Sequence, residues 1–499
     1  MYFLGIDCGT QGSKAVILDG KANTIIGKGY FKHDLIIKEN GVREQKAQWW
    51  IEAIENAIFE AINSSNIDPK KIKSIGVSGQ QHGLVPLDKD GNVIRTVKLW
   101  NDTSTKEEND FIVNSLGGMD EVWNTIGGTL PIGYTASKVK YLIDKEPDVY
   151  RKTSHILLPH DYINYYLTGN YYTDPSEVSG TGYYDIKNHM YSQKMLNIID
   201  PSGLLKAKLP KVINWETPVG KLRKSLALKF NMSENVIVSA GGGDNTMGAI
   251  GTGSIIPGYC TISLGTSGTC CFASKKKNED IHKLIQIYDL LNEKYLCTSC
   301  ILGATSSTTK IQELFSLSIK EFDQLMEEAP IGANGLLSLP FYDGERIPPI
   351  PSGEGLIKNI SASNLSKGNI IRASAESIIF ILKNGYDHMI KSFEAPSEFI
   401  ITGGGSNSSP WRQILADIFD KKIYCLKENE GGALGAAIQA CYLYKYLNEE
   451  NINLFEIIKS NIEYDDRKTT FPIKMNVKLY EKYFKLFKDA ITKEWGVEV

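Results

Sequence analysis

The feature that most constrains this chain is a strand–turn–strand unit that occurs twice, about half a chain apart. Residues 2–7 and 14–19 are short apolar runs joined by a Gly-rich turn at 8–13, which predicts a β-hairpin. A second apolar run at 259–264 leads into Gly-Thr-Ser-Gly at 265–268 and then into another apolar run. This separation is far longer than the repeat of a solenoid, so it favours a duplicated domain.

Helix and strand patterns follow each hairpin. In the first half, apolar residues recur at helical spacing over 48–62, and 71–79 has the pattern of a buried strand. In the second half, 372–390 has a helical pattern and 397–402 the pattern of a strand. The alternation predicts an α/β fold, with the second copy starting near residue 250.

Length and charge limit the classes of function. A chain of 499 residues exceeds one ordinary core, so two large domains are expected. With 55 basic against 58 acidic residues, the net charge of −3 provides no basic field for nucleic acid or an anionic membrane. Eight scattered cysteines, no basic leader and no long apolar run predict a cytoplasmic protein with a small-molecule partner.

Two Gly-Thr turns are candidate phosphate sites. The sequence has neither a P-loop motif nor a dinucleotide-binding glycine motif. In the turns at 9–12 and 265–268, glycine allows backbone N–H groups to converge on an anion. Either turn alone is better explained as an ordinary hairpin turn, but two matching copies favour phosphate binding. Asp7, just before the first turn, could hold Mg²⁺ or could simply cap the turn.

Three further loops carry polar groups or glycines at strand ends. Asp244 follows three glycines and could be a general base for a substrate hydroxyl, or could cap the helix that follows. Gln81 and His82 suit hydrogen bonding to a polyol or ketose, although a single loop histidine is usually solvated. The Gly run at 403–405 precedes a helix and could admit a nucleotide close to the backbone.

Taken together, these segments resemble the FGGY carbohydrate kinases, and within that family they most resemble the xylulose kinases. The resemblance runs nearly end to end. It is carried by GIDCGTQGSK at 5–14, GVSGQQHG at 76–83, AGGGDNTMGAIG at 240–251, SLGTSG at 263–268 and GGGSNSSPWRQILAD at 403–417.

The resemblance implies a fold and a separate role for each domain. It implies two ribonuclease H-like domains of the actin and hexokinase type, with sugar and ATP meeting in a cleft between them. The domains are expected at 1–246, on the sugar-binding side, and at 247–499, on the nucleotide-binding side. By the same resemblance Asp244 is the catalytic base and Asp7 is the carboxylate on the metal side.

Binding residues also follow from the resemblance. Gln81, His82, Asp244 and Asn245 would contact the sugar. The nucleotide-binding set would come from the two phosphate turns and an adenosine loop: Gly9, Thr10, Gln11, Lys14, Gly265, Thr266, Ser267, Gly404, Gly405 and Asn407. Ser406-Asn407 stands where the family often has Ala-Arg, which puts nucleotide preference in question.

The implied activity is Mg²⁺- and ATP-dependent phosphorylation of D-xylulose at O5, giving D-xylulose 5-phosphate for pentose use, by a chain that could form a homodimer. The segment GQQHG at 79–83 favours xylulose over glycerol, gluconate or ribulose. Two alternatives stay open. One is an FGGY kinase for another ketose or polyol, and the other is a non-catalytic actin-like sensor of sugar or nucleotide.

Overall fold

The structure is a computed structural model that describes residues 1–275, 285–290, 294–342, 344–350, 353–428, 430–448, 452–497 and 499. The chain divides into two compact units. The first unit comprises 1–253, 287–295 and 430–462, and the second comprises 254–286, 296–429 and 463–499. The division expected from sequence, into continuous stretches meeting at 246 and 247, differs from this one because 287–295 and 430–462 return to the first unit.

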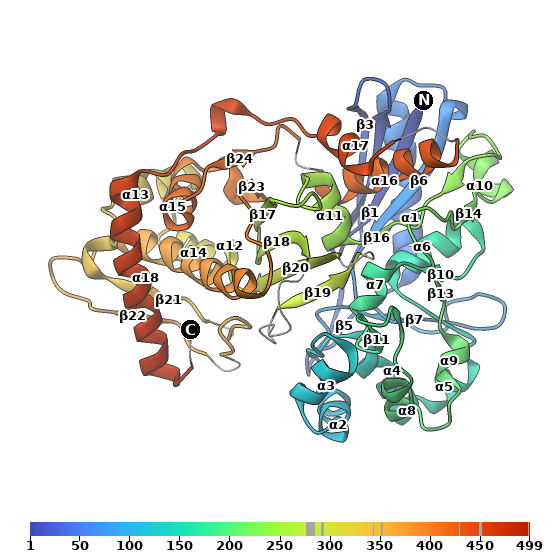
Figure 1. Ribbon diagram of the computed structural model, residues 1–499, viewed down its shortest axis with the longest axis horizontal. Helices are drawn as coiled ribbons and strands as arrows, with labels where there is room; N and C mark the ends of the chain where they lie inside the picture. Colours follow the sequence, from blue (N-terminus) through green and yellow to red (C-terminus); the bar gives the residue numbers. More distant parts are fainter. Residues whose placement is uncertain are drawn as a thin grey trace. The chain divides into compact units, whose positions relative to one another are not determined.

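A twisted sheet forms the centre of the first unit (Figure 1). Its strand order is β14-β15-β6-β1-β2-β3, and β16 pairs with β6. The predicted hairpin is confirmed, because β1 and β2 pair antiparallel, while β6 runs parallel to β1. The strand bounds are β1 Tyr2–Cys8, β2 Gly12–Asp19, β3 Thr24–Lys32, β6 Ile72–Gly79, β14 Gly220–Lys221, β15 Ile237–Val238 and β16 Gly242–Gly243.

Helices α1 (Ala47–Ser65) and α16 (Gly431–Leu447) cover this sheet. Successive side chains of a strand point to opposite faces. Leu4 therefore enters the apolar core that includes Trp50 of α1, whereas Gly5 faces α16. A Cβ atom at Gly5 would lie 1.9 Å from the Ala433 carbonyl oxygen, so helix and strand can touch only because this residue is glycine.

Helices inserted between the strands complete the first unit. Those at 106–145 and 193–199 surround a second apolar core, built from residues such as Ile112, Val139 and Leu196, whereas the helix at 159–168 contributes Ile163 and Leu167 to the first core. Their bounds are α2 Lys106–Leu116, α3 Met119–Ile126, α4 Thr135–Lys145, α6 Pro159–Thr168, α7 Pro175–Ser179, α8 Gln193–Ile199 and α11 Asp244–Thr252.

The second unit repeats the strand order of the first. Five of its strands lie in the order β20-β18-β17-β23-β24. As in the first unit, the hairpin strands β17 and β18 are antiparallel, and β17, β23 and β24 are mutually parallel. The duplication predicted from the two hairpins is thus confirmed in topology. The bounds are β17 Tyr259–Leu264, β18 Gly268–Lys275, β20 Lys294–Ile301, β23 Glu398–Thr402 and β24 Ile423–Cys425.

The helices predicted for the second half are also present. The predicted helix at 372–390 lies within α14 (Lys367–Ser392), which packs against α15 (Ser409–Phe419). The amphipathic tail forms α18 (Lys474–Trp495) and buries Tyr480, Phe487 and Ile491. Helix α12 (Thr305–Leu314) directly follows β20.

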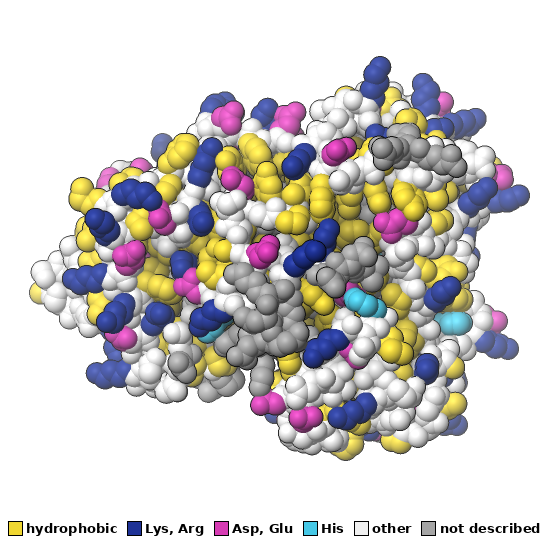
Figure 2. Space-filling view, in the orientation of Figure 1, with side chains coloured by type: hydrophobic (Ala, Val, Ile, Leu, Met, Phe, Trp, Pro, Cys, Tyr) yellow, Lys and Arg dark blue, Asp and Glu magenta, His cyan; other side chains and the backbone are white. Residues whose placement is uncertain are grey.

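The surface carries charges of both signs. On the face drawn in Figure 2, basic and acidic side chains are interspersed, in keeping with the small net charge. Within the described ranges, none of the helices is long and apolar enough to cross a membrane.

Candidate active site

Asp244 stands at the start of a helix, directly after a short edge strand. Gly242 and Gly243 pair with Ser78 and Gly79 of β6, and α11 begins at Asp244 itself. The sequence left open whether Asp244 caps this helix; the capping position belongs to Gly243, and Asp244 is the first helical residue. The Asn245 backbone N–H donates to the Asp244 Oδ1 over 2.8 Å, which orients the carboxylate.

The glycine turn before Asp244 is held from two sides. Gln439 of α16 accepts from the Gly241 N–H over 2.8 Å and donates to the Gly241 carbonyl over 3.0 Å. His160 of α6 donates from Nε2 to the Ala240 carbonyl over 2.7 Å. Both side chains are fully buried, so the turn is rigidly placed. Nothing in the local sequence around Asp244 indicates these two supports, because they come from distant helices.

The carboxyl group of Asp244 has a strongly shifted pKa. Burial by the surrounding protein, followed by the negative charge of Asp7, raises the pKa of Asp244 to about 7. The side chain nevertheless stays accessible to solvent. A reachable carboxylate with a pKa near neutral is suited to accept a proton from a substrate hydroxyl group.

Asp7 lies near the end of β1, between Ser78 of β6 and Lys14 of β2. The Ser78 hydroxyl group donates to Asp7 Oδ1 over 2.7 Å, and Lys14 is opposite Asp7 on β2. Burial raises the pKa of Asp7 even though Ser78 and Lys14 act in the other direction. A Cβ atom at Gly432 would lie 2.8 Å from the carboxyl carbon of Asp7, so the first turn of α16 closes over this carboxylate. Gly432 was not singled out from sequence.

The first Gly-Thr turn is tightly bonded within its unit. The Gly9 N–H donates to the Gly12 carbonyl over 3.0 Å. The Thr10 hydroxyl group accepts from Trp100 Nε1 over 3.0 Å and donates to Gln80 Oε1 over 3.1 Å. The single proton of the Thr10 hydroxyl group is therefore engaged with Gln80.

Two other residues of the first turn region reach toward solvent. Gln11 is exposed, and its carbonyl accepts from the His33 N–H over 3.3 Å. Lys14 pairs with Glu430 over 3.2 Å, and its side chain is 44% exposed. A partly exposed ion pair of this kind is weak enough to exchange for a phosphate group.

Gln81 and Asn245, both predicted to contact sugar, are joined directly. Asn245 Nδ2 donates to Gln81 Oε1 over 2.7 Å. His82 is held separately. Its Nδ1 bonds the Gly180 carbonyl over 2.6 Å, and because a carbonyl only accepts, Nδ1 carries the proton. The His82 ring also stacks on Tyr134, with 4.2 Å between the ring centroids.

His82 has an unusual backbone that a buried lysine stabilises. Its φ of 63° lies in the left-handed region, which is uncommon for a residue other than glycine. Lys138 Nζ donates to the His82 carbonyl over 2.6 Å, and the Thr135 hydroxyl group donates to it over 3.2 Å. Burial lowers the pKa of Lys138 to about 7. No local pattern around His82 indicates either supporting residue, because both lie more than fifty positions further along the chain.

In the second unit, three segments meet at the second Gly-Thr turn. The Gly265 N–H donates to the Ser267 carbonyl over 3.1 Å, and the Ser306 hydroxyl group at the start of α12 donates to the Thr266 carbonyl over 2.9 Å. A Cβ atom at Gly405 would lie 2.8 Å from Leu264, so the loop at 403–405 passes directly beside the turn.

The three predicted adenosine-loop residues differ in their surroundings. Space around Gly404 is open, because a Cβ atom there would meet nothing within 4 Å. Gly405 is buried against Leu264. The Asn407 side-chain oxygen accepts from Lys468 Nζ over 3.1 Å.

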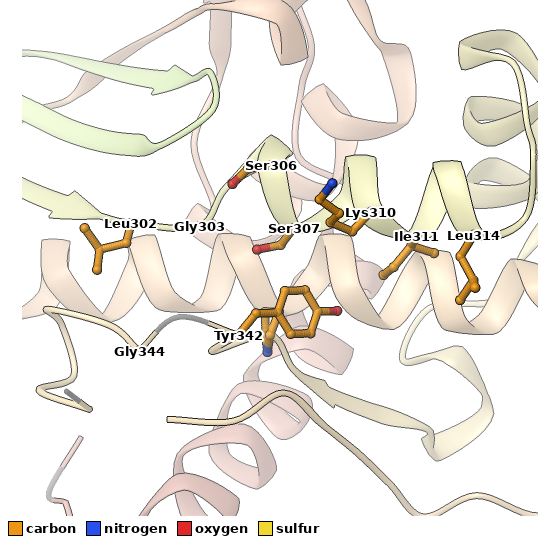
Figure 3. A pocket seen from close by; sticks show the side chains of 10 residues that line it. Leu302, Gly303, Ser306, Ser307, Lys310, Ile311, Leu314, Tyr342 and Gly344 are labelled. Atoms are coloured by element: carbon orange, nitrogen blue, oxygen red, sulfur yellow. The ribbon is translucent and has the colours of Figure 1, made fainter. Parts of the chain in front are cut away.

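A pocket of about 520 Å³ lies beside this turn, along one side of α12 (Figure 3). Ser306, Ser307 and Lys310 line it from the helix, and the Tyr342 ring lies across from them. Its size and its mixture of apolar and polar groups suit a small organic ligand. The sequence analysis did not predict this pocket, because its two walls are separated by about thirty residues of chain.

The predicted site residues therefore form two groups. One group, in the first unit, contains Asp7, Gly9, Thr10, Gln11, Lys14, Gln81, His82, Asp244 and Asn245. The other, in the second unit, contains Gly265, Thr266, Ser267, Gly404, Gly405 and Asn407. Among the described residues, no cluster of three or more His, Cys, Asp or Glu side chains is arranged to hold a metal ion alone.

Comparison with known proteins identifies the family. Residues 2–251 match the model of the N-terminal domain of the FGGY family of carbohydrate kinases. Residues 260–444 match the model of the C-terminal domain of the same family. The chain therefore belongs to the FGGY family of carbohydrate kinases and is a phosphotransferase.

Relatives and solved structures agree with this assignment. The chain is 40% identical to a xylulose kinase of Haemophilus influenzae over 489 residues, which cover 97% of this chain and 98% of that protein. It is 30% identical to a xylulose kinase of Bacillus subtilis, with 98% and 97% covered. Crystal structures of a ligand-bound xylulose kinase and of a gluconate kinase, both from Lactobacillus acidophilus, share the fold. Each has a TM-score of 0.90 at 24% identity, with 99% of both chains covered.

Proposed function

We propose that this kinase transfers the γ-phosphoryl group of ATP to the O5 hydroxyl group of D-xylulose, giving D-xylulose 5-phosphate and ADP. Two curated relatives matched over nearly their whole length are xylulose kinases, which supports xylulose as the acceptor. The observation that carries the chemistry is the accessible Asp244 carboxylate, whose pKa is raised to about 7. The presence of this base argues against the alternative of a non-catalytic sensor.

In the proposed reaction, Asp244 accepts the proton of the O5 hydroxyl group as O5 forms its bond to the γ-phosphorus. The bond between that phosphorus and the bridging oxygen of ATP breaks, and ADP leaves with the electron pair. Phosphoryl transfer has a loose transition state, so positioning of the hydroxyl group contributes much of the acceleration. Gln81, His82 and Asn245 would orient the sugar for this step.

The predicted nucleotide segments and the pocket beside α12 suit different parts of ATP. The Gly-Thr turns at 9–12 and 265–268, with Lys14, would contact phosphate groups through backbone N–H groups and one cation. The pocket beside α12 would take the nucleoside, because Ser306 in its lining also bonds the turn at 265–268. Asn407 would contribute to the same region.

The residues present fit a divalent cation that arrives with ATP. The negative charge of Asp7 raises the pKa of Asp244, so a cation beside the two carboxylates would relieve this repulsion. We propose Asp7 as the residue that holds Mg²⁺, directly or through water, since Mg²⁺ commonly binds one carboxylate plus substrate phosphates. When bound, Mg²⁺ would neutralise charge on the phosphoryl group.

A substrate panel tests the proposed function. Purified protein with Mg-ATP would be given D-xylulose, D-ribulose, L-xylulose, gluconate and glycerol, with ADP release measured by a coupled assay. We expect kcat/KM for D-xylulose to exceed the others by at least about tenfold, since one well-bonded hydroxyl group discriminates by that much or more. A higher value for another ketose or polyol would reassign the acceptor, and gluconate is included because a gluconate kinase shares the fold. ATP consumption that no sugar stimulates would contradict kinase activity.

Location and assembly complete the proposal. We place the kinase in the cytoplasm, where ATP is available and the thiol groups of its eight cysteines would stay reduced. We also propose a homodimer, supported by exposed apolar side chains on α18 at Met475, Leu479 and Leu486. Light scattering after size-exclusion chromatography would give the mass, and a mass of one chain at micromolar concentration would exclude the dimer.

A further inference from the structure

One buried carboxyl group near the site has no assigned task. Glu177 lies on α7, and its side chain is 0% exposed. Neither of its oxygens makes a hydrogen bond of good geometry. Burying an unsatisfied polar group is unfavourable, so such a group at a functional site calls for an explanation.

The Gln81 carboxamide lies beside Glu177. Gln81 Nε2 is also buried without a hydrogen-bond partner. A Cβ atom at Gly243 would lie 2.4 Å from Glu177 Oε2 and 2.4 Å from Gln81 Nε2. An unsatisfied acceptor and an unsatisfied donor therefore flank the same glycine, one residue before Asp244. Only a glycine at 243 leaves room for both groups.

Gln81 connects Glu177 to the predicted sugar contacts. Gln81 Oε1 accepts from Asn245 Nδ2 over 2.7 Å, in the first turn of α11. Helix α7 itself is fixed by Asp174, whose carboxylate accepts from the backbone N–H groups of Ser176 and Glu177 over 3.0 Å each. Helix α7, which carries Glu177, is therefore held in place beside Gln81 and Asn245.

The charges around Glu177 favour its neutral form. Burial comes first, followed by the negative charges of Asp161, Asp174 and Asp244, and together they hold the pKa of Glu177 well above its ordinary value. Gln81 acts in the opposite direction. A protonated carboxyl group can accept from Gln81 Nε2 while donating its own proton elsewhere.

We propose that Glu177 is a positioning residue for the sugar, whose carboxyl group holds the Gln81 carboxamide in the orientation in which Gln81 and Asn245 meet the sugar hydroxyl groups. This inference rests on the proposed function, because it assigns Glu177 to the sugar-binding part of that site. Glu177 is fully buried and acts on the sugar through Gln81 rather than by contact.

Three variants test the role of Glu177. Glu177→Ala removes the support, Glu177→Gln replaces it with an uncharged group of the same shape, and Ser179→Ala controls for damage to α7. In wild-type protein the Ser179 hydroxyl group donates to the Pro175 carbonyl on the same helix. KM for D-xylulose and KM for ATP would be measured separately at one pH, and D-xylulose binding would be measured by calorimetry.

We expect Glu177→Ala to raise KM and Kd for D-xylulose about tenfold, because the Gln81 carboxamide loses the polar group beside it, while KM for ATP changes less than about twofold. Glu177→Gln should restore sugar binding to within about threefold of wild type. Ser179→Ala should keep the wild-type values.

Several results would overturn the proposal: unchanged sugar binding in Glu177→Ala, equal losses for sugar and ATP, or a Glu177→Gln variant as defective as Glu177→Ala. Failure of the proposed function would be seen separately, in wild-type protein. If wild-type protein prefers another sugar of the panel, the same variants are measured with that sugar. If it binds no sugar of the panel, both proposals fail.

Discussion

At the scale of the residue, the site depends on two carboxylates whose pKa values the surrounding protein raises. Asp7 and Asp244 would each be ionised at neutral pH in an unfolded chain, near their ordinary pKa of 3.8. In the folded chain burial raises both pKa values, and the negative charge of Asp7 adds to the rise at Asp244, whose pKa reaches about 7. The fold thus converts an ordinary acidic side chain into a base matched to neutral pH.

Replacing Asp244 with Asn should separate catalysis from stability. We expect Asp244→Asn to lower kcat at least about 10³-fold, because no proton acceptor remains at the sugar hydroxyl group. The variant should also melt at a higher temperature than wild type at pH 8. The unfolded Asp244 loses its proton near pH 3.8 and the folded one near 7, so the free energy of unfolding falls as pH rises between these values, and Asn removes this penalty.

Coupled ADP assays and thermal melts at pH 5 and pH 8 would check both parts. The gain in melting temperature should be smaller at pH 5, because the free energy of unfolding of wild-type protein has fallen less at that pH than at pH 8. A variant that keeps most of its turnover would contradict the role of Asp244, and equal gains at both pH values would contradict the raised pKa.

The pH dependence of wild-type activity follows from the same group. Below about pH 7, kcat/KM for the sugar should fall with decreasing pH, approaching tenfold per pH unit, because protonated Asp244 cannot accept the hydroxyl proton. Initial rates at low sugar concentration in buffers of constant ionic strength would show the inflection. An inflection near pH 4 would mean that the pKa of Asp244 is not raised in the free enzyme.

At the scale of the element, close contact between α16 and the first sheet positions Asp7. Small residues make the contact possible: Gly5 faces the Ala433 carbonyl, Gly76 faces the Ala436 carbonyl, and Gly432 sits against Asp7. A sequence rich in Gly and Ala at 431–440 predicts a closely packed helix. It does not show which surface the helix covers, because strand β1 lies more than four hundred residues earlier.

Two Gly→Ala variants test this contact. Gly5→Ala would place a Cβ atom 1.9 Å from the Ala433 oxygen, so α16 must shift, and we expect a loss of about 2 kcal/mol or more in the free energy of unfolding. Gly248→Ala, inside α11 where a Cβ atom meets nothing within 4 Å, should instead gain up to about 1 kcal/mol from helix propensity. Urea unfolding would measure both. A Gly5→Ala variant as stable as wild type would show that α16 does not pack on β1 in this way.

At the scale of the whole molecule, the two units are interleaved along the chain. The first unit is incomplete without 430–462, which supplies α16. The same segment carries Gln439, which bonds the backbone of Gly241 in the turn before Asp244. The boundary predicted at 246 and 247 rests on the duplication of the hairpins. The observed division differs because the chain returns to the first unit at 287–295 and 430–462.

A fragment experiment tests this interdependence. A fragment of residues 1–253 should aggregate or melt without cooperativity, because the sheet face at Gly5 and Gly76 loses its cover. Co-expression with a peptide of residues 430–462 should increase the soluble yield and restore a cooperative melt. A monomeric 1–253 fragment that melts cooperatively alone would show that α16 is not needed for the first unit to fold.

The sequence by itself determined the class of fold and predicted the central residues of the candidate site. Its two hairpins predicted the duplication because strand periodicity and Gly-rich turns are local signals, and the motifs around Asp7, Gln81 and Asp244 are local as well. Only the tertiary structure decided which residues support them. Glu177, Lys138, Gln439 and the pocket beside α12 act through contacts between distant segments. Such contacts leave no local pattern, because burial and pKa depend on what the folded chain places around each group.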